Sequence, residues 1–177
     1  MWNLVTLDGF FEGPTKWDVD FHESVWGAEL EQLSLEQLRA TDTLLFGRVT
    51  YEGMAGYWPT AQGEVADLMN EISKVVFSAT LEKATWRHTR LVRRNAPDEI
   101  ADLKRQPGRD MLIFGSAELS AALLPRRLID EYRLCLAPLV LGAGTPLFKP
   151  SSERMKMKLL QVTPLGSGGV VLRYQSE

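Results

Sequence analysis

The residues best suited to chemistry follow three short apolar runs. Gly47-Arg48 and Gly115-Ser116 each stand between a predicted strand and a predicted helix, and Ser78 begins a hydroxyl-bearing segment after a third strand. A glycine at such a turn lets a ligand approach the backbone closely, and the free N–H groups of a helix start favour an anion. Together these strand ends predict a phosphate-rich ligand lying across a parallel sheet, for which a nucleotide cofactor is the natural candidate.

Each of these segments also has a plainer interpretation. Gly47, Arg48 and Thr50 can supply backbone N–H groups, a cation and a hydroxyl to a phosphate, but they equally fit a helix start with a solvent-facing arginine. Ser116 fits a helix N-cap, a role that is compatible with phosphate binding because a cap leaves other N–H groups free. Ser78, together with Thr80, is a candidate for a second phosphate only because Arg48 is present.

Asp8 is the carboxylate nearest to the expected reactive end of such a ligand. It follows the first predicted strand and could orient a substrate amide or pass a proton. The alternative is a turn aspartate before Gly9. Asp18, Asp20 and Glu23 compete for the same role.

Composition excludes several classes of function. The 177 residues predict one domain, with roughly 70% of the unfolded surface buried, and a net charge of −3 offers no general attraction to nucleic acid or an anionic membrane. No apolar stretch approaches the roughly 20 residues that span a bilayer. The chain has two histidines and one cysteine, too few for a Cys/His zinc site, so we predict no metal. The single Cys135, which we expect to be buried, cannot form an intramolecular disulfide, and we predict a cytoplasmic protein.

The pattern of apolar residues predicts an α/β fold with a mainly parallel sheet and an antiparallel C-terminal hairpin. Residues 10–20 read as loop, and helical spacing over 21–39 contains a possible capping box at Ser34, which would divide it into two helices. The remaining predicted strands cover 2–7, 43–46, 74–78, 90–93, 111–114, 130–141, 157–163 and 170–174; the remaining helices cover 49–54 and 63–72, a segment opened by Pro97, and 117–124.

Six segments, in this order, resemble the dihydrofolate-reductase-like family that includes the C-terminal reductase domain of the bifunctional riboflavin-pathway deaminase–reductase. The segments are Thr6–Phe11, Leu45–Glu52, Lys74–Leu81, Ile113–Ser116, Leu128–Arg133 and Pro138–Gly142. Each is weak alone, but their order and spacing are specific, and the resemblance covers nearly the whole chain.

The resemblance implies a three-layer dihydrofolate-reductase-like domain over residues 1–177 that takes its hydride from NADPH. It implies a catalytic or orienting role for Asp8, and it implies a homodimer formed through the C-terminal strands. The cofactor site that it implies consists of Thr6, Gly47, Arg48, Thr50, Ser78, Thr80, Gly115 and Ser116.

The chain also departs from the family pattern. It has no His-x-Glu or Pro-Cys-x-x-Cys zinc signature of a deaminase, and the helix carboxylate that contacts the pterin in dihydrofolate reductases could be Glu23, Glu29 or Glu31. We therefore expect a small heterocyclic substrate, either pterin-like or a (ribosylamino)pyrimidine. The alternatives are a nicotinamide-nucleotide-binding module without turnover and a dimeric scaffold without cofactor.

Overall fold

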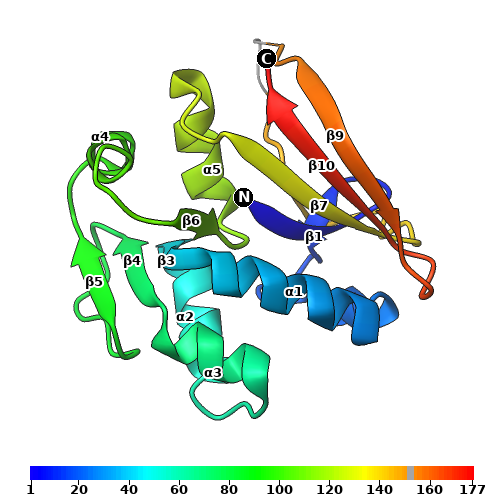
Figure 1. Cartoon of the computed structure of the whole chain (residues 1–177), viewed down its shortest axis with the longest axis horizontal. Helices are drawn as coiled ribbons and strands as arrows, with labels where there is room; N and C mark the ends of the chain where they lie inside the picture. Colours follow the sequence, from blue (N-terminus) through cyan, green and yellow to red (C-terminus); the bar gives the residue numbers. More distant parts are fainter. Residues whose placement is uncertain (151–153) are drawn as a thin grey trace. The chain divides into compact units, whose positions relative to one another are not determined.

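The computed structural model describes residues 1–150 and 154–177 and divides the chain into two compact units. Unit 1 comprises Met1–Leu30 and Ile129–Glu177, and unit 2 comprises Glu31–Leu128. Helix α1 (Ala28–Ala40) carries the chain from the first unit into the second (Figure 1). The expectation of a single domain stays a prediction.

Unit 2 is built on a four-stranded sheet in the order β5-β4-β3-β6, in which every pair of neighbours is parallel. Helices α2 and α3 lie on one face of this sheet, and α4 and α5 lie on the other (Figure 1). Its elements are β3 (Thr41–Gly47), α2 (Arg48–Tyr57), α3 (Glu64–Glu71), β4 (Ser73–Phe77), β5 (Thr89–Val92), α4 (Ala96–Leu103), β6 (Asp110–Ile113), α5 (Ala117–Leu123) and the 3₁₀ helix η2 (Leu124–Arg126). Because the strands are parallel, all four carboxyl ends meet at one edge.

The centre of this sheet is apolar on both faces, as expected for strands covered by helices on each side. Leu44, Leu45, Phe46 and Val76 are all essentially inaccessible. Lys74 of β4 is buried as well, but its Nζ donates to the carbonyl oxygens of Asn70 (3.1 Å) and Ile72 (2.5 Å). The ammonium group thus satisfies carbonyls at the end of α3, which have no partner within the helix.

Unit 1 contains a mixed four-stranded sheet in the order β1-β7-β10-β9. Strand β1 pairs with β7 in parallel, whereas β10 is antiparallel to both β7 and β9. Its elements are β1 (Trp2–Thr6), β2 (Phe10–Glu12), the 3₁₀ helix η1 (Asp20–Ser24), β7 (Glu131–Ala137), β8 (Thr145–Pro146), β9 (Met157–Pro164) and β10 (Val170–Ser176). The predicted α/β architecture, with a mainly parallel sheet and an antiparallel C-terminal hairpin, is confirmed.

Three local predictions were wrong. Residues 10–20 are not all loop, because β2 pairs with β8 from a segment more than 130 residues away, for which the sequence carries no signal. Helix α1 runs unbroken through Ser34, and the actual interruption separates it from η1 at residues 25–27. Strand β7 ends at Ala137 rather than at residue 141, since Leu139 to Gly142 turn back toward the end of β1.

Candidate functional site

The turns after β3 and β6 lie beside each other at the carboxyl edge of the sheet in unit 2. Strand β3 pairs with β6 in register up to Leu45 and Ile113, so the two turns are adjacent. The Gly47 N–H donates to Ser116 Oγ (3.0 Å), and the Ser116 N–H donates to Thr50 Oγ1 (3.0 Å). The structure therefore brings four of the predicted site residues together: Gly47, Thr50, Gly115 and Ser116.

These hydrogen bonds change what each group can offer to a ligand. The N–H groups of Gly47 and Ser116 already have acceptors, and Thr50 is buried. Ser116 occupies the N-cap position of α5, as one interpretation predicted, but its hydroxyl donates to Phe114 O (2.8 Å) and makes no side-chain cap. Thr50 and Ser116 therefore position the two turns. The donors left for an anion are the first-turn N–H groups of α2 and α5, which have no acceptor within their helices.

Arg48 is the first residue of α2 and carries the only charge at this pair of turns among the predicted site residues. Its side chain is 41% exposed, and Nη1 donates to both carboxylate oxygens of Glu52 at 3.1 Å. An exposed i,i+4 ion pair contributes only about 0.3–0.5 kcal/mol. The guanidinium can therefore exchange Glu52 for a phosphate at small cost.

A second group of polar residues lies at the ends of β4 and β5. Ser78 Oγ accepts hydrogen bonds from the N–H groups of Thr80 (3.1 Å) and Leu81 (2.9 Å). Arg93, the first residue after β5, donates to the carbonyl oxygens of Ala79 (3.3 Å) and Glu82 (3.0 Å), so it lies against the same loop. Sequence analysis placed Arg93 at the end of a predicted strand and not in the site; its position at the end of a strand beside β4 is the signal that could have identified it.

Asp8 belongs to unit 1 and is held in a network of donors. Thr6 Oγ1 donates to Oδ1 (2.5 Å), and the N–H groups of Leu141 and Gly142 donate to Oδ1 (3.2 Å) and Oδ2 (2.8 Å). The Thr6 hydroxyl, followed by these backbone groups, lowers the pKa of the exposed Asp8 carboxyl from 3.8 to about 2. Asp8 is therefore an anion at neutral pH, suited to accept a hydrogen bond and poorly suited to donate a proton.

The competing carboxylates of unit 1 have different surroundings. Glu29 Oε2 accepts the N–H of Gly166 (2.5 Å), so this residue fixes the turn between β9 and β10. Glu23 lies exposed on η1, and its neighbour His22 is largely buried, which lowers the pKa of the imidazole to about 4. The His22 imidazole is therefore uncharged at neutral pH.

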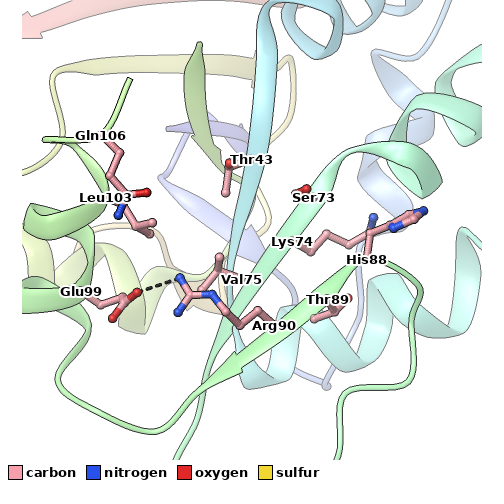
Figure 2. A pocket seen from close by; sticks show the side chains of 10 residues that line it. All are labelled: Thr43, Ser73, Lys74, Val75, His88, Thr89, Arg90, Glu99, Leu103 and Gln106. Carbon is pink, nitrogen blue, oxygen red and sulfur yellow. Dashed lines mark hydrogen bonds and ion pairs between the residues drawn. The ribbon is translucent and has the colours of Figure 1, made fainter. Parts of the chain in front are cut away.

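Unit 2 also has a groove of about 700 Å³ that shares no residue with the two turns. Figure 2 shows it between the amino-terminal ends of β4 and β5 and the end of α4, with Arg90 reaching across to Glu99. That ion pair (2.7 Å) and the Arg94–Glu99 pair occupy the Glu99 carboxylate. The groove therefore lies away from the predicted cofactor edge.

Two further searches cover the described part of the chain, residues 1–150 and 154–177. Nowhere in it do three or more His, Cys, Asp or Glu side chains come together in a way that could hold a metal ion. None of its helices has the length and apolar character needed to cross a bilayer.

The order of these elements and turns matches a known family. A family model described as the RibD C-terminal domain matches residues 1–171. The chain belongs to this family. The resemblance inferred from the six sequence segments is thereby confirmed, and the family is of the reductase-domain type.

Individual members support the same placement. The uncharacterised Bacillus subtilis protein YyaP is 31% identical over 176 residues, covering 96% of this chain and 90% of YyaP. A Shewanella sp. PV-4 protein whose name refers to riboflavin biosynthesis has a TM-score of 0.80 at 21% identity, covering 99% of this chain and 97% of its own. Dihydrofolate reductase from Enterococcus faecalis, solved with NADP(H), has a TM-score of 0.67 at 13% identity. The match covers 99% of this chain and 94% of the reductase. The predicted dihydrofolate-reductase-like fold is confirmed.

Proposed function

We propose that this chain is an NADPH-dependent reductase that transfers a hydride to a pterin-like or (ribosylamino)pyrimidine substrate, in a reaction resembling that of 5-amino-6-(5-phosphoribosylamino)uracil reductase. The observation that carries the proposal is that the turns after β3 and β6 are joined by two hydrogen bonds beside the half-exposed Arg48. Membership of the RibD C-terminal domain family supports it.

The residues of unit 2 fit the phosphates of a dinucleotide. Gly47 has no side chain between the turn and solvent, Arg48 supplies a cation, and α2 is long enough to present unpaired N–H groups at its start. Ser78, Thr80 and Arg93 form a second polar group at the neighbouring strand ends. Together with Arg48, this group suits the additional phosphate that distinguishes NADPH from NADH. The reduced nicotinamide supplies the hydride, while the protein binds, orients and excludes water.

Thr6 and Asp8 have a different task in this proposal. The Asp8 carboxylate remains charged at neutral pH and is held by Thr6 and the Leu141–Gly142 backbone. It thus provides a fixed hydrogen-bond acceptor that can orient a substrate N–H. The proton that completes the reduction has to come from another group or from water.

The test is a titration of the purified protein with NADPH and NADH, read by tryptophan fluorescence and thermal shift. We expect NADPH to bind more tightly, and Arg48→Ala to weaken NADPH by about 10- to 150-fold while hardly changing NADH, since a charge-assisted hydrogen bond contributes about 1.5–3 kcal/mol. Arg126→Ala is the matched control, because Arg126 is also an exposed arginine in an ion pair of unit 2. Equal weakening of both cofactors by Arg48→Ala would assign Arg48 to the fold alone.

The alternative is a nicotinamide-nucleotide-binding module without turnover. It rests on the ambiguity of the substrate-side carboxylate, which could be Glu23, Glu29 or Glu31. Stoichiometric NADPH binding with no oxidation across a panel of pterins and pyrimidines would favour this module. Hydride transfer to any member of the panel would exclude it.

We further propose that the chain forms a homodimer through β9. This strand lies at the edge of the sheet of unit 1, and Leu159, Leu160 and Val162 expose large apolar surfaces there. An unpaired apolar edge strand favours association with another strand. Sedimentation equilibrium should give twice the chain mass of 19.9 kDa, whereas a monomer at all concentrations would contradict the proposal. A cytoplasmic location also stays a prediction.

A further inference from the structure

The segment between β4 and β5, residues 78–88, contains no helix or strand, so side chains have to hold its backbone in place. The Ser78 hydroxyl closes its first turn, and Arg93 donates to two of its carbonyl oxygens. Near its other end, the Trp86 N–H donates to the hydroxyl oxygen of Tyr51 (2.9 Å). The segment is therefore fastened to α2, because Tyr51 belongs to that helix.

The contact between Tyr51 and Trp86 lies in the interior of unit 2. Tyr51 is 2% exposed and Trp86 is 4% exposed, and their ring centroids are 6.3 Å apart. The indole Nε1 of Trp86 donates to Asn70 Oδ1 (2.7 Å), and Lys74 Nζ lies 4.5 Å from the centroid of the same ring. Because Tyr51 and Trp86 are both buried, removal of the Tyr51 hydroxyl would leave the Trp86 N–H without its acceptor.

This anchor acts on the part of the segment that orients a cation of the proposed cofactor site. Ser78 is already tied to β5, since its N–H donates to Val92 O (3.1 Å). The Tyr51 anchor therefore acts on residues 79–86, two of whose carbonyl oxygens accept from Arg93 at 3.3 Å and 3.0 Å. A guanidinium has more N–H groups than these two carbonyl oxygens use. The others remain for a phosphate, and their direction depends on where the segment lies.

Resting on the proposed function, we propose that Tyr51 is a positioning residue that sets the preference for NADPH over NADH. It is buried and acts on the cofactor only through residues 79–86 and Arg93. Arg48 and Tyr51 are three positions apart on α2, about 4.5 Å along the helix axis. One helix thus fixes Arg48 and the segment that orients Arg93. The additional phosphate of NADPH uses the second cation, whereas NADH has no group that reaches it.

The test removes the Tyr51 hydroxyl alone, in Tyr51→Phe, which retains the aromatic ring. Thr41→Val is the matched control, because Thr41 is also buried in unit 2 and its hydroxyl donates to a backbone carbonyl, Gln37 O (2.8 Å), at the amino end of β3. Hydrogen–deuterium exchange without cofactor reports on residues 79–86. Titration with NADPH and NADH gives the ratio of the two dissociation constants, which a merely structural role would not change.

We expect Tyr51→Phe to speed exchange in residues 79–86. It should weaken NADPH about three- to tenfold and NADH less than about twofold, since the segment then has to be ordered when NADPH binds. Thr41→Val should leave both the exchange of this segment and the ratio unchanged. In combination with Arg93→Ala, Tyr51→Phe should weaken NADPH little further, because both substitutions act on the same contact.

Three results would overturn this role: unchanged exchange in residues 79–86, equal weakening of NADPH and NADH in Tyr51→Phe, or fully additive effects of Tyr51→Phe and Arg93→Ala. If the original protein does not bind NADPH, or does not prefer it to NADH, the proposed function is wrong and the role of Tyr51 in selectivity falls with it. Because exchange is measured without cofactor, faster exchange in Tyr51→Phe would then still show the anchor, so the two failures are distinguishable.

Discussion

Gly47 and Gly115 occupy equivalent places, each between a parallel strand and a helix, but they are glycines for different reasons. Gly115 has φ +53, and a Cβ there would lie 3.1 Å from Thr50 Cγ2 and 3.3 Å from Thr50 Oγ1. Gly47 has an extended backbone (φ −76, ψ 161), and a Cβ would meet its nearest atoms at an ordinary 3.8 Å. The fold itself requires glycine at 115 and does not require it at 47, as expected if Gly47 serves the close approach of the phosphate that we propose.

Of the substitutions that test this comparison, Gly115→Ala is expected to have the largest effect on stability. A non-glycine residue in the left-handed region costs about 1–2 kcal/mol, and displacement of Thr50 would also weaken its hydrogen bond with the Ser116 N–H. We expect a loss of about 2 kcal/mol in the free energy of unfolding, measured by urea denaturation. A loss below about 0.5 kcal/mol would show that the turn relaxes easily. A side chain at position 115 would then cause no more backbone strain than one at position 47.

Gly47→Ala should show the opposite behaviour. The free energy of unfolding should change by less than about 0.5 kcal/mol, because the poorer N-cap is offset by lower entropy of the unfolded chain. The affinity for NADPH should nevertheless fall, since the new methyl group stands where the backbone would meet a phosphate. If the variant binds NADPH as tightly as the original protein, Gly47 does not face the cofactor.

The smallest effect is expected at Asp8, in the other unit. The lowered pKa of Asp8, about 2 against 3.8, means that the folded protein holds fewer protons than the unfolded chain between these values. Its contribution to stability is therefore complete above about pH 4 and is lost as the pH falls toward 2. Asp8→Asn should remove this part of the acid dependence in urea denaturation series, leave NADPH affinity nearly intact and lower turnover.

An Asp8→Asn variant with an unchanged rate would transfer the substrate-orienting role to a helix acid, Glu23, Glu29 or Glu31. An acid dependence identical to that of the original protein would show that Thr6, Leu141 and Gly142 do not hold the carboxylate in solution.

Much of this could be predicted from the sequence because the signals were local. The apolar runs before Gly47, Ser78 and Gly115 identify three strands, and the alternation of strands with helices implies parallel pairing. The interruption before α1 and the short strand β2 were missed, because one depends on the packing of η1 and the other on pairing with residues 145–146. Propensity and spacing carry no information on such distant partners.

For the candidate site, the sequence by itself determined the residue types and the family to which they belong. Only the tertiary structure decided what each residue is free to do. It placed the N–H groups of Gly47 and Ser116 in internal hydrogen bonds, buried Thr50, left Arg48 half-exposed, and lowered the pKa of the Asp8 carboxyl. The reason is that the contacts of Gly47, Thr50 and Ser116 with one another and of Asp8 with Gly142 join residues 66 to 134 positions apart, which meet only when the chain folds.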